Sequence, residues 1–130
     1  MAELTYNAKL AIVKVLNEIL NADNVVHEKE VKYMNEVIQD FGLGSNYEDD
    51  IETLLTLQAL ATIRELNVEQ KEMVAKMMGK MIVIDNDINY NEVKLYNAFC
   101  KSCEIEKDFN VKDYADVTLS GPFTNPEELL

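Results

Sequence analysis

Apolar residues recur along most of this chain at the three- and four-residue spacing that is typical of amphipathic helices. Between positions 9 and 21 the polar residues share one side of a helical wheel, and apolar residues fill the remainder. Such a wide apolar arc predicts a first helix that is buried on several sides. A second periodic segment runs to Phe41 and stops at Gly42, the residue type that favours a left-handed helix C-cap.

The same periodicity, together with the start signals of helices, predicts four more. A Ser or Asn with Glu or Gln three residues later is a capping box, and this pattern begins a third helix at Ser45 and a fifth at Asn67. Between them a fourth helix covers about 57–66, after a break near Thr56, and a sixth begins after Asn89. Both prolines lie in the last nine residues, so neither interrupts these helices. We therefore expect an all-α bundle of six or more helices.

Part of the chain repeats with an offset of 62 residues. The segments 23–32 and 85–94 share five of their ten positions, and the apolar residues that flank them keep the same register. Since a match of that length can arise by chance, the flanks carry the argument for a repeat. We expect two helix-loop-helix units, at about 9–43 and 71–105, that pack on each other about a pseudo-two-fold axis. A polar tail at about 106–130 follows, and the sequence leaves open whether it folds back over the bundle or mediates contacts.

The composition agrees with one folded domain over residues 1–130. Hydrophobic residues make up 48% and charged residues 28% of the chain, values that are typical of globular proteins. The apolar runs are too short to cross a membrane, and the N-terminus lacks the basic and then apolar plan of a signal peptide. We therefore expect no membrane association and a cytoplasmic location.

The charge balance is strongly acidic. Asp and Glu together number 24 against 12 Lys and Arg, which gives a formal net charge of -12. A phosphate-binding face needs clustered basic residues, whereas the lysines here alternate with carboxylates at helical spacing. Nucleic acid is therefore not an expected partner. A negative surface suits cations or a basic protein, and we expect a protein partner of this kind.

The repeated residues resemble the TerB-like domains, a family named for tellurite resistance that also includes the N-terminal cytoplasmic region of certain membrane-anchored co-chaperones. Its signature is a helix ending in Ala-Asp, a loop of Gly, any residue and Ile or Val, and a Glu seven residues after the Asp. Asp23 and Glu30 hold the acidic positions in the first copy. Asp85 and Glu92 hold them in the second, and Asn replaces the usual Gly in both loops. The resemblance covers most of the chain and implies an all-helical bundle, but the family has no settled biochemical activity.

The acidic residues around the two loops have two interpretations. If His27 and Asn89 are N-caps, Glu30 and Glu92 lie at the third helical position, where a Glu side chain reaches back to the backbone N–H of the cap. The resemblance implies instead a weak divalent-cation site, and clustered carboxylates do repel one another unless a cation such as Ca²⁺ or Mg²⁺ neutralises them. The ligands predicted for that site are Asp23, Glu30, Asp85, Asp87 and Glu92.

The remaining reactive residue types form no catalytic motif. Cys100 and Cys103 align with core positions of the first copy, so we interpret them as small buried hydrophobic groups and not as a redox or zinc pair. His27 is the only histidine of the chain. The sequence also lacks a glycine-rich phosphate loop and a serine in a nucleophile elbow.

The sequence therefore predicts a non-enzymatic interaction or ion-responsive module, which the resemblance links to stress or tellurite resistance. Two alternatives stay open. A metal-dependent hydrolase would use the acidic cluster to hold a catalytic metal, although such sites normally need histidine or more convergent carboxylates. A structural scaffold would bind a basic protein through its acidic face.

Overall fold

The computed structural model describes residues 4–22, 26–84 and 88–114. Within these ranges the chain forms six α-helices and one short 3-10 helix, and no strand. The elements are α1 (Tyr6–Leu20), α2 (Glu28–Phe41), α3 (Tyr47–Thr53), α4 (Thr56–Arg64), α5 (Val68–Val83), α6 (Tyr90–Ser102) and η1 (Val111–Tyr114). The all-α bundle expected from the sequence is therefore confirmed for the described residues. None of their helices has the length and apolar character needed to cross a membrane.

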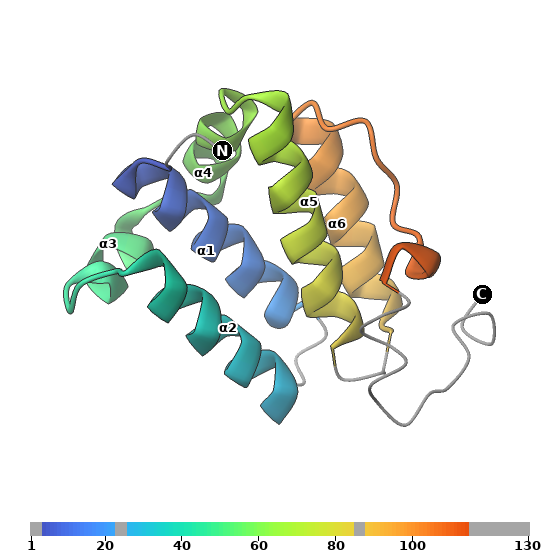
Figure 1. The fold of residues 1–130 in the computed structure, drawn as a ribbon, viewed down its shortest axis with the longest axis horizontal. Helices are drawn as coiled ribbons and strands as arrows, with labels where there is room; N and C mark the ends of the chain where they lie inside the picture. Colours follow the sequence, from blue (N-terminus) through green and yellow to red (C-terminus); the bar gives the residue numbers. More distant parts are fainter. Residues whose placement is uncertain (1–3, 23–25, 85–87, 115–130) are drawn as a thin grey trace.

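Helix α1 lies at the centre of the bundle. It packs against α2, α3, α4, α5 and α6, and Figure 1 shows it between α2 on one side and α5 on the other. Ile12, Val15, Leu16 and Ile19 are fully buried. The wide apolar arc of the first helix is thus explained, because every side of α1 except a narrow polar strip meets another helix. Each such side chain stabilises the fold by about 1.5–3 kcal/mol through its removal from water.

The end of α2 is fixed in the way that the sequence predicts. Gly42 adopts the left-handed conformation, with a φ angle of 66°, and its backbone N–H donates to the last carbonyls of the helix. A second contact comes from α1, since Lys9 Nζ donates to the carbonyl oxygen of Phe41 at 3.0 Å. A positive charge at this point favours the negative end of the helix dipole. The ammonium group of Lys9 therefore ties the start of α1 to the end of α2.

The starts of the later helices agree with the sequence at Asn67 and differ at Ser45. Asn67 Oδ1 accepts the Gln70 backbone N–H at 2.8 Å, and Gln70 Oε1 accepts the Asn67 backbone N–H at 3.1 Å, so the predicted capping box is formed. Helix α3, in contrast, has Asn46 as its N-cap. Ser45 lies in a turn that the Tyr47 N–H closes onto the Gly44 carbonyl at 3.2 Å, and this turn shifts the helix start by one residue.

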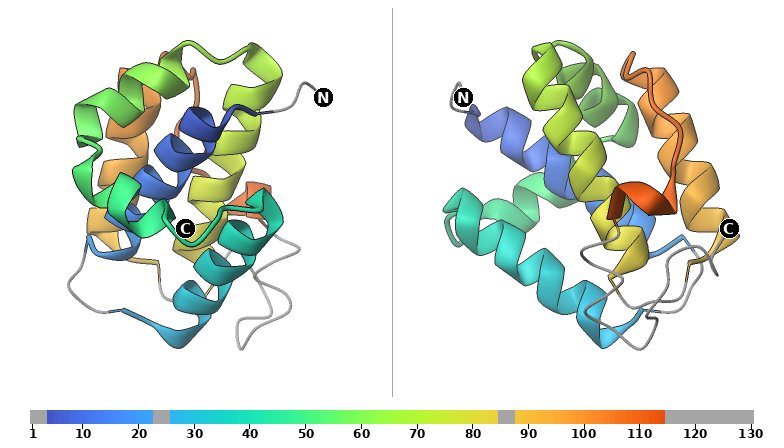
Figure 2. Two further views of the ribbon diagram at one scale, coloured as in Figure 1. Left: turned by 90° about the vertical axis from the view of Figure 1, so that its left-hand side faces the viewer. Right: turned by 45° about the vertical axis from the view of Figure 1, so that its right-hand side comes forward.

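The segment after α6 folds back on the bundle. Residues 111–114 of the predicted tail form η1, which packs against α5, so for this part of the tail the structure decides a question that the sequence leaves open. Val111 and Tyr114 are buried there. Figure 2 shows η1 on the outside of the pair formed by α5 and α6. Two apolar side chains among polar neighbours are enough to hold this short helix, because α5 supplies the other half of the contact.

Candidate functional site

Two buried glutamates occupy the same position in α2 and α6. Glu30 and Glu92 are each the third residue of their helix, after the N-caps His27 and Asn89, and both have a relative exposure of 0%. Glu30 Oε1 accepts the backbone N–H of His27 at 3.1 Å. A buried carboxylate is tolerated only when its oxygens are hydrogen bonded. Helix capping therefore accounts for the position of one carboxylate oxygen of Glu30.

The predicted cation site lies only partly within the described residues. Of its five carboxylates the structure describes Glu30 and Glu92, whereas Asp23, Asp85 and Asp87 lie outside the described ranges. Among the residues that are described, no group of three or more His, Cys, Asp or Glu side chains has the arrangement needed to hold a metal ion. Binding of Ca²⁺ or Mg²⁺ at the two loops therefore stays a prediction from the sequence.

Helix α3 concentrates negative charge on the surface. Four of its seven residues are acidic, none is basic, and all four carboxylates are exposed. They are Glu48, Asp49, Asp50 and Glu52. Three of them lie in the first turn, where carboxylates favour the positive end of the helix dipole. Sequence reasoning missed this cluster because it treated α3 only as a helix with a capping signal.

A groove lies beside these carboxylates, between α1, α2 and α3. Its volume is about 490 Å³. Val13 and Met34, both buried, form its apolar floor, and half-buried Ile38 and Ile51 extend it. The other lining residues are Lys14, Asn17, Asn35, Tyr47, Glu48 and Glu52. The groove thus combines an apolar floor and one aromatic ring with an acidic edge.

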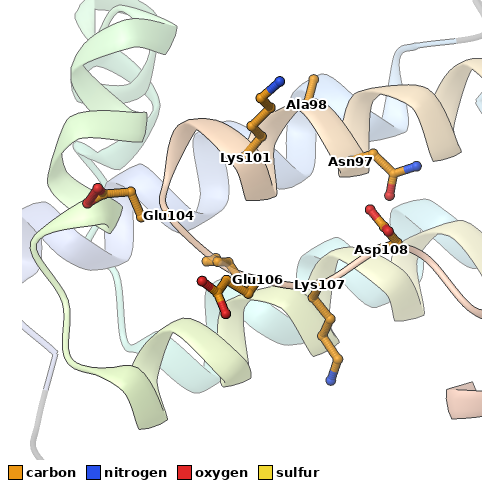
Figure 3. Close-up of a pocket in the computed structure, with 8 residues that line it drawn as sticks. Asn97, Ala98, Lys101, Glu104, Glu106, Lys107 and Asp108 are labelled. Atoms are coloured by element: carbon orange, nitrogen blue, oxygen red, sulfur yellow. The ribbon is translucent and has the colours of Figure 1, made fainter.

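A second hollow lies where α6 passes into the following segment, and its volume is about 630 Å³. Figure 3 shows that the Asn97 side chain of α6 faces Asp108 of that segment, whereas the Lys101 side chain points away from it. The lining has basic and acidic side chains in similar number and contains no Cys, His or Ser. Because charges of both signs alternate there, this hollow presents no field of one sign to a ligand.

The two cysteines are buried and free. Burial raises the pKa of both the Cys100 and the Cys103 thiol to about 11, so both are protonated at neutral pH. Cys103 Sγ donates to the carbonyl oxygen of Leu60 at 3.5 Å. The burial expected from the alignment with core positions is therefore confirmed. A protonated, enclosed thiol is a poor nucleophile and a poor metal ligand.

An aromatic cluster joins α6 to η1 and was not expected from the sequence. The rings of Tyr96 and Phe109 meet edge to face, with centroids 5.6 Å apart, and those of Phe109 and Tyr114 stack at 5.9 Å. The Tyr114 hydroxyl donates to the carbonyl oxygen of Ala75 at 3.2 Å. Burial raises the pKa of Tyr114 to about 12. This cluster fastens η1 to the surface formed by α5 and α6.

Comparisons with known proteins bear on the fold. No protein-family model matches the sequence, and no curated protein matches it. Among solved structures, the chain is similar to the crystal structure of a protein of unknown function from Porphyromonas gingivalis W83, with 24% sequence identity and a TM-score of 0.67. The match covers 84% of this chain and 86% of that one. At this identity the likeness shows a shared fold and nothing about activity.

Proposed function

We propose that this chain is a non-enzymatic protein-interaction module of TerB-like type, which binds a basic segment of a partner through helix α3. The observation that carries the proposal is the set of four exposed carboxylates on that seven-residue helix, with no basic residue among them. Complementary charge speeds the encounter of two proteins and selects against partners of the same sign. With a net charge of -12, the rest of the chain reinforces this preference.

A second part of the proposal is that the bundle consists of two copies of one helical unit. The helix starts support it: Thr5 Oγ1 accepts the Ala8 N–H at 3.1 Å before α1. The residues 62 positions later behave alike, since Asn67 Oδ1 accepts the Gln70 N–H at 2.8 Å before α5. Helices α1 and α5 therefore begin with the same side-chain cap.

The helix ends support the same idea. Gly42 after α2 has a φ angle of 66°, and Glu104, which lies 62 residues later after α6, has a φ angle of 58°. At both ends the next residue donates its N–H to the carbonyl five residues earlier, at 3.5 Å after α2 and 2.8 Å after α6. Positive φ is rare for a residue other than glycine. The left-handed residue that follows each helix, Gly42 after α2 and Glu104 after the C-cap Cys103 of α6, is thus a strong reason to pair α6 with α2.

The TerB-like character and the cellular role belong to the proposal as well. The all-helical fold and the paired glutamates after the two loops support the resemblance. The role in stress or tellurite resistance, the cytoplasmic location and the lack of catalysis are inferred from the resemblance and from the residue types of the chain.

The test is a titration of the full chain with a short lysine peptide, at low and at high salt. We expect binding that weakens with salt, because exposed charges are screened. A variant with all four α3 acids replaced by their amides should bind about tenfold more weakly, since each exposed pair contributes a few tenths of a kcal/mol. Isothermal titration calorimetry measures both affinities.

A matched control variant loses the same number of negative charges at positions outside α3. Glu65, Glu69, Glu72 and Glu106 are also exposed, and replacing these four by Gln removes the same total charge. We expect the control to bind the peptide within about twofold of the unmodified chain. Equal losses in the two variants would show that only the net charge matters and that α3 is not the binding surface.

A further inference from the structure

The place that the groove occupies in the first half of the chain is filled by an aromatic side chain in the second half. There, the Tyr114 hydroxyl bonds to the Ala75 carbonyl at 3.2 Å, and the ring stacks on Phe109. Gly79 makes room for it, because a Cβ at that position would overlap the Tyr114 hydroxyl. The slot formed by α5, α6 and η1 thus holds a tyrosine supplied by the chain itself.

The corresponding positions on α1 line the groove. An offset of 62 residues takes Ala75 back to Val13, which lies on the groove floor. The same offset takes Gly79 back to Asn17, which also lines the groove. Helix α3 packs against α1 as η1 packs against α5. The walls of the groove are therefore the counterparts of the walls of the tyrosine slot.

The aromatic side chains themselves have no counterpart. Tyr96 corresponds to Met34, which is buried at the groove floor. Tyr114 corresponds to Glu52, which is exposed at the groove edge. The first half thus has a flexible aliphatic side chain in place of one tyrosine and a charged, solvent-exposed side chain in place of the other. The first half therefore lacks both rings, and Asn17 carries a side chain where Gly79 leaves room for a ring.

One stacking partner remains in the first half. The offset takes Phe109, on which the Tyr114 ring stacks, back to Tyr47, and Tyr47 lines the groove. Aromatic rings attract one another in offset or edge-to-face arrangements, in addition to the gain from burial. The apolar floor and the ring of Tyr47 therefore suit an aromatic guest.

We propose that the groove between α1, α2 and α3 binds an aromatic side chain of a partner protein, in a segment with Lys or Arg on both sides of that aromatic residue. This inference rests on the proposed function and specifies the sequence that the module would recognise. The basic flanks follow from charge complementarity, since Glu48 and Glu52 border the groove and the remaining acids of α3 lie beside them.

The cation within the groove does not oppose such a guest. Lys14 Nζ donates to the carbonyl oxygen of Ile51 at 3.4 Å and lies 4.0 Å from Glu18 Oε1. Its charge is thus already balanced by protein groups. An acidic or phosphorylated segment would meet the α3 carboxylates and be repelled. A basic segment is therefore the favoured occupant.

The experiment compares two capped peptides on the full chain, one with tyrosine between two pairs of lysines and one with alanine in its place. We expect the tyrosine peptide to bind about tenfold more tightly, as one buried aromatic group provides. In two-dimensional NMR spectra of the ¹⁵N-labelled chain, its additional shift changes should be confined to groove residues such as Val13, Met34 and Ile51.

A pair of variants at one exposed position tests the mechanism. Glu52→Tyr gives the first half the residue of the second, fills the groove from its edge and should abolish the preference for the tyrosine peptide. Glu52→Gln removes the same charge without filling the groove. The affinity for both peptides should therefore decrease by the same factor, and the preference for the tyrosine peptide should persist. Because Glu52 is exposed, neither change disturbs the core, and melting temperatures verify this.

The outcomes separate this inference from the proposed function. Equal binding of the two peptides, with salt-sensitive affinity and dependence on α3, overturns the aromatic site and leaves the interaction module standing. No binding of either peptide overturns both. If Phe123→Ala in the full chain shifts the groove resonances, the occupant is the C-terminal segment of this chain itself, and the partner proposal is wrong.

Discussion

The ring of Tyr114 lies so close to Gly79 that no other residue type fits at position 79 without displacing it. The hydroxyl bonds to α5 through Ala75, and the ring is almost completely buried. This contact joins a residue of η1 to the middle of α5 and explains why a glycine is found inside a helix, where it normally reduces stability. The first prediction follows from this contact.

We expect Gly79→Ala to destabilise the fold by about 1–3 kcal/mol, because the added methyl group overpacks the slot. In an open helix the same change would stabilise by about 1 kcal/mol, so the sign of the effect is diagnostic. Gly44→Ala is the control, since nothing lies within 4 Å of a Cβ there. Urea denaturation followed by circular dichroism measures the difference, and a more stable Gly79→Ala variant would contradict the contact.

The left-handed backbone at Glu104 gives a second prediction, of opposite sign. Glu104→Gly should stabilise the protein by roughly 0.5–1 kcal/mol. Glycine removes the strain of a side chain at positive φ, which is about 1–2 kcal/mol. Part of this gain is lost because glycine also raises the conformational entropy of the unfolded chain. Gly42→Ala, at the equivalent helix end, should destabilise by about 1 kcal/mol. Thermal melts of both variants provide the test, and two effects of the same sign would argue against the shared C-cap.

The buried thiols predict how stability changes with pH. Burial raises the pKa of Cys100 and of Cys103 from the ordinary value of 9.0 to about 11, so above pH 9 the unfolded chain loses protons that the folded chain retains. Their contribution to the free energy of unfolding is complete below pH 9 and is lost as the pH rises towards 11. The free energy of unfolding, measured by denaturation at several alkaline pH values, should fall more steeply with pH for the native sequence than for a variant with Ala at both positions. Native thiolate absorbance that appears near pH 9 would show that the thiols are accessible.

The cation site predicted from the sequence is tested by thermal stability. A ligand that binds only the folded state raises the melting temperature. At a free-ligand concentration of a hundred times Kd, the free energy of unfolding rises by about 2.7 kcal/mol. We expect Ca²⁺ or Mg²⁺ to produce such a rise and EDTA to reverse it. Asp85→Asn and Asp87→Asn should remove the effect, whereas Asp108→Asn, at an exposed position after α6, should not. A rise that survives in all three variants would leave helix capping as the role of the paired glutamates.

Much of the fold could be predicted because its signals are local. The wide apolar arc of α1, the glycine that ends α2 and the reciprocal cap of Asn67 and Gln70 each depend on residues within a few positions of one another. Hydrogen bonds of this range are decided by the neighbouring sequence. The turn at Ser45 shows the limit, since there the Tyr47 N–H bonds to the Gly44 carbonyl and the helix begins one residue later than the predicted cap indicates.

The candidate site could not be predicted because it depends on distant residues. Val13, Met34 and Glu52 come together only after α1, α2 and α3 have packed, and no local pattern joins them. The sequence leaves open whether the residues of η1 contact the bundle, because their two apolar side chains find a packing partner only on α5, which is distant in the sequence. The acidic character of α3 was visible in the sequence, but its position beside a groove was not.

The central place of α1 affects how the protein is made. This helix leaves the ribosome before the other five, yet its apolar surface is covered only when α6 has also been synthesised, because all five pack on it. Until then the nascent chain exposes the apolar surface of α1, which chaperones recognise and which favours aggregation. Folding should therefore be completed in one cooperative step after synthesis, and chains cut short before α6 should be degraded.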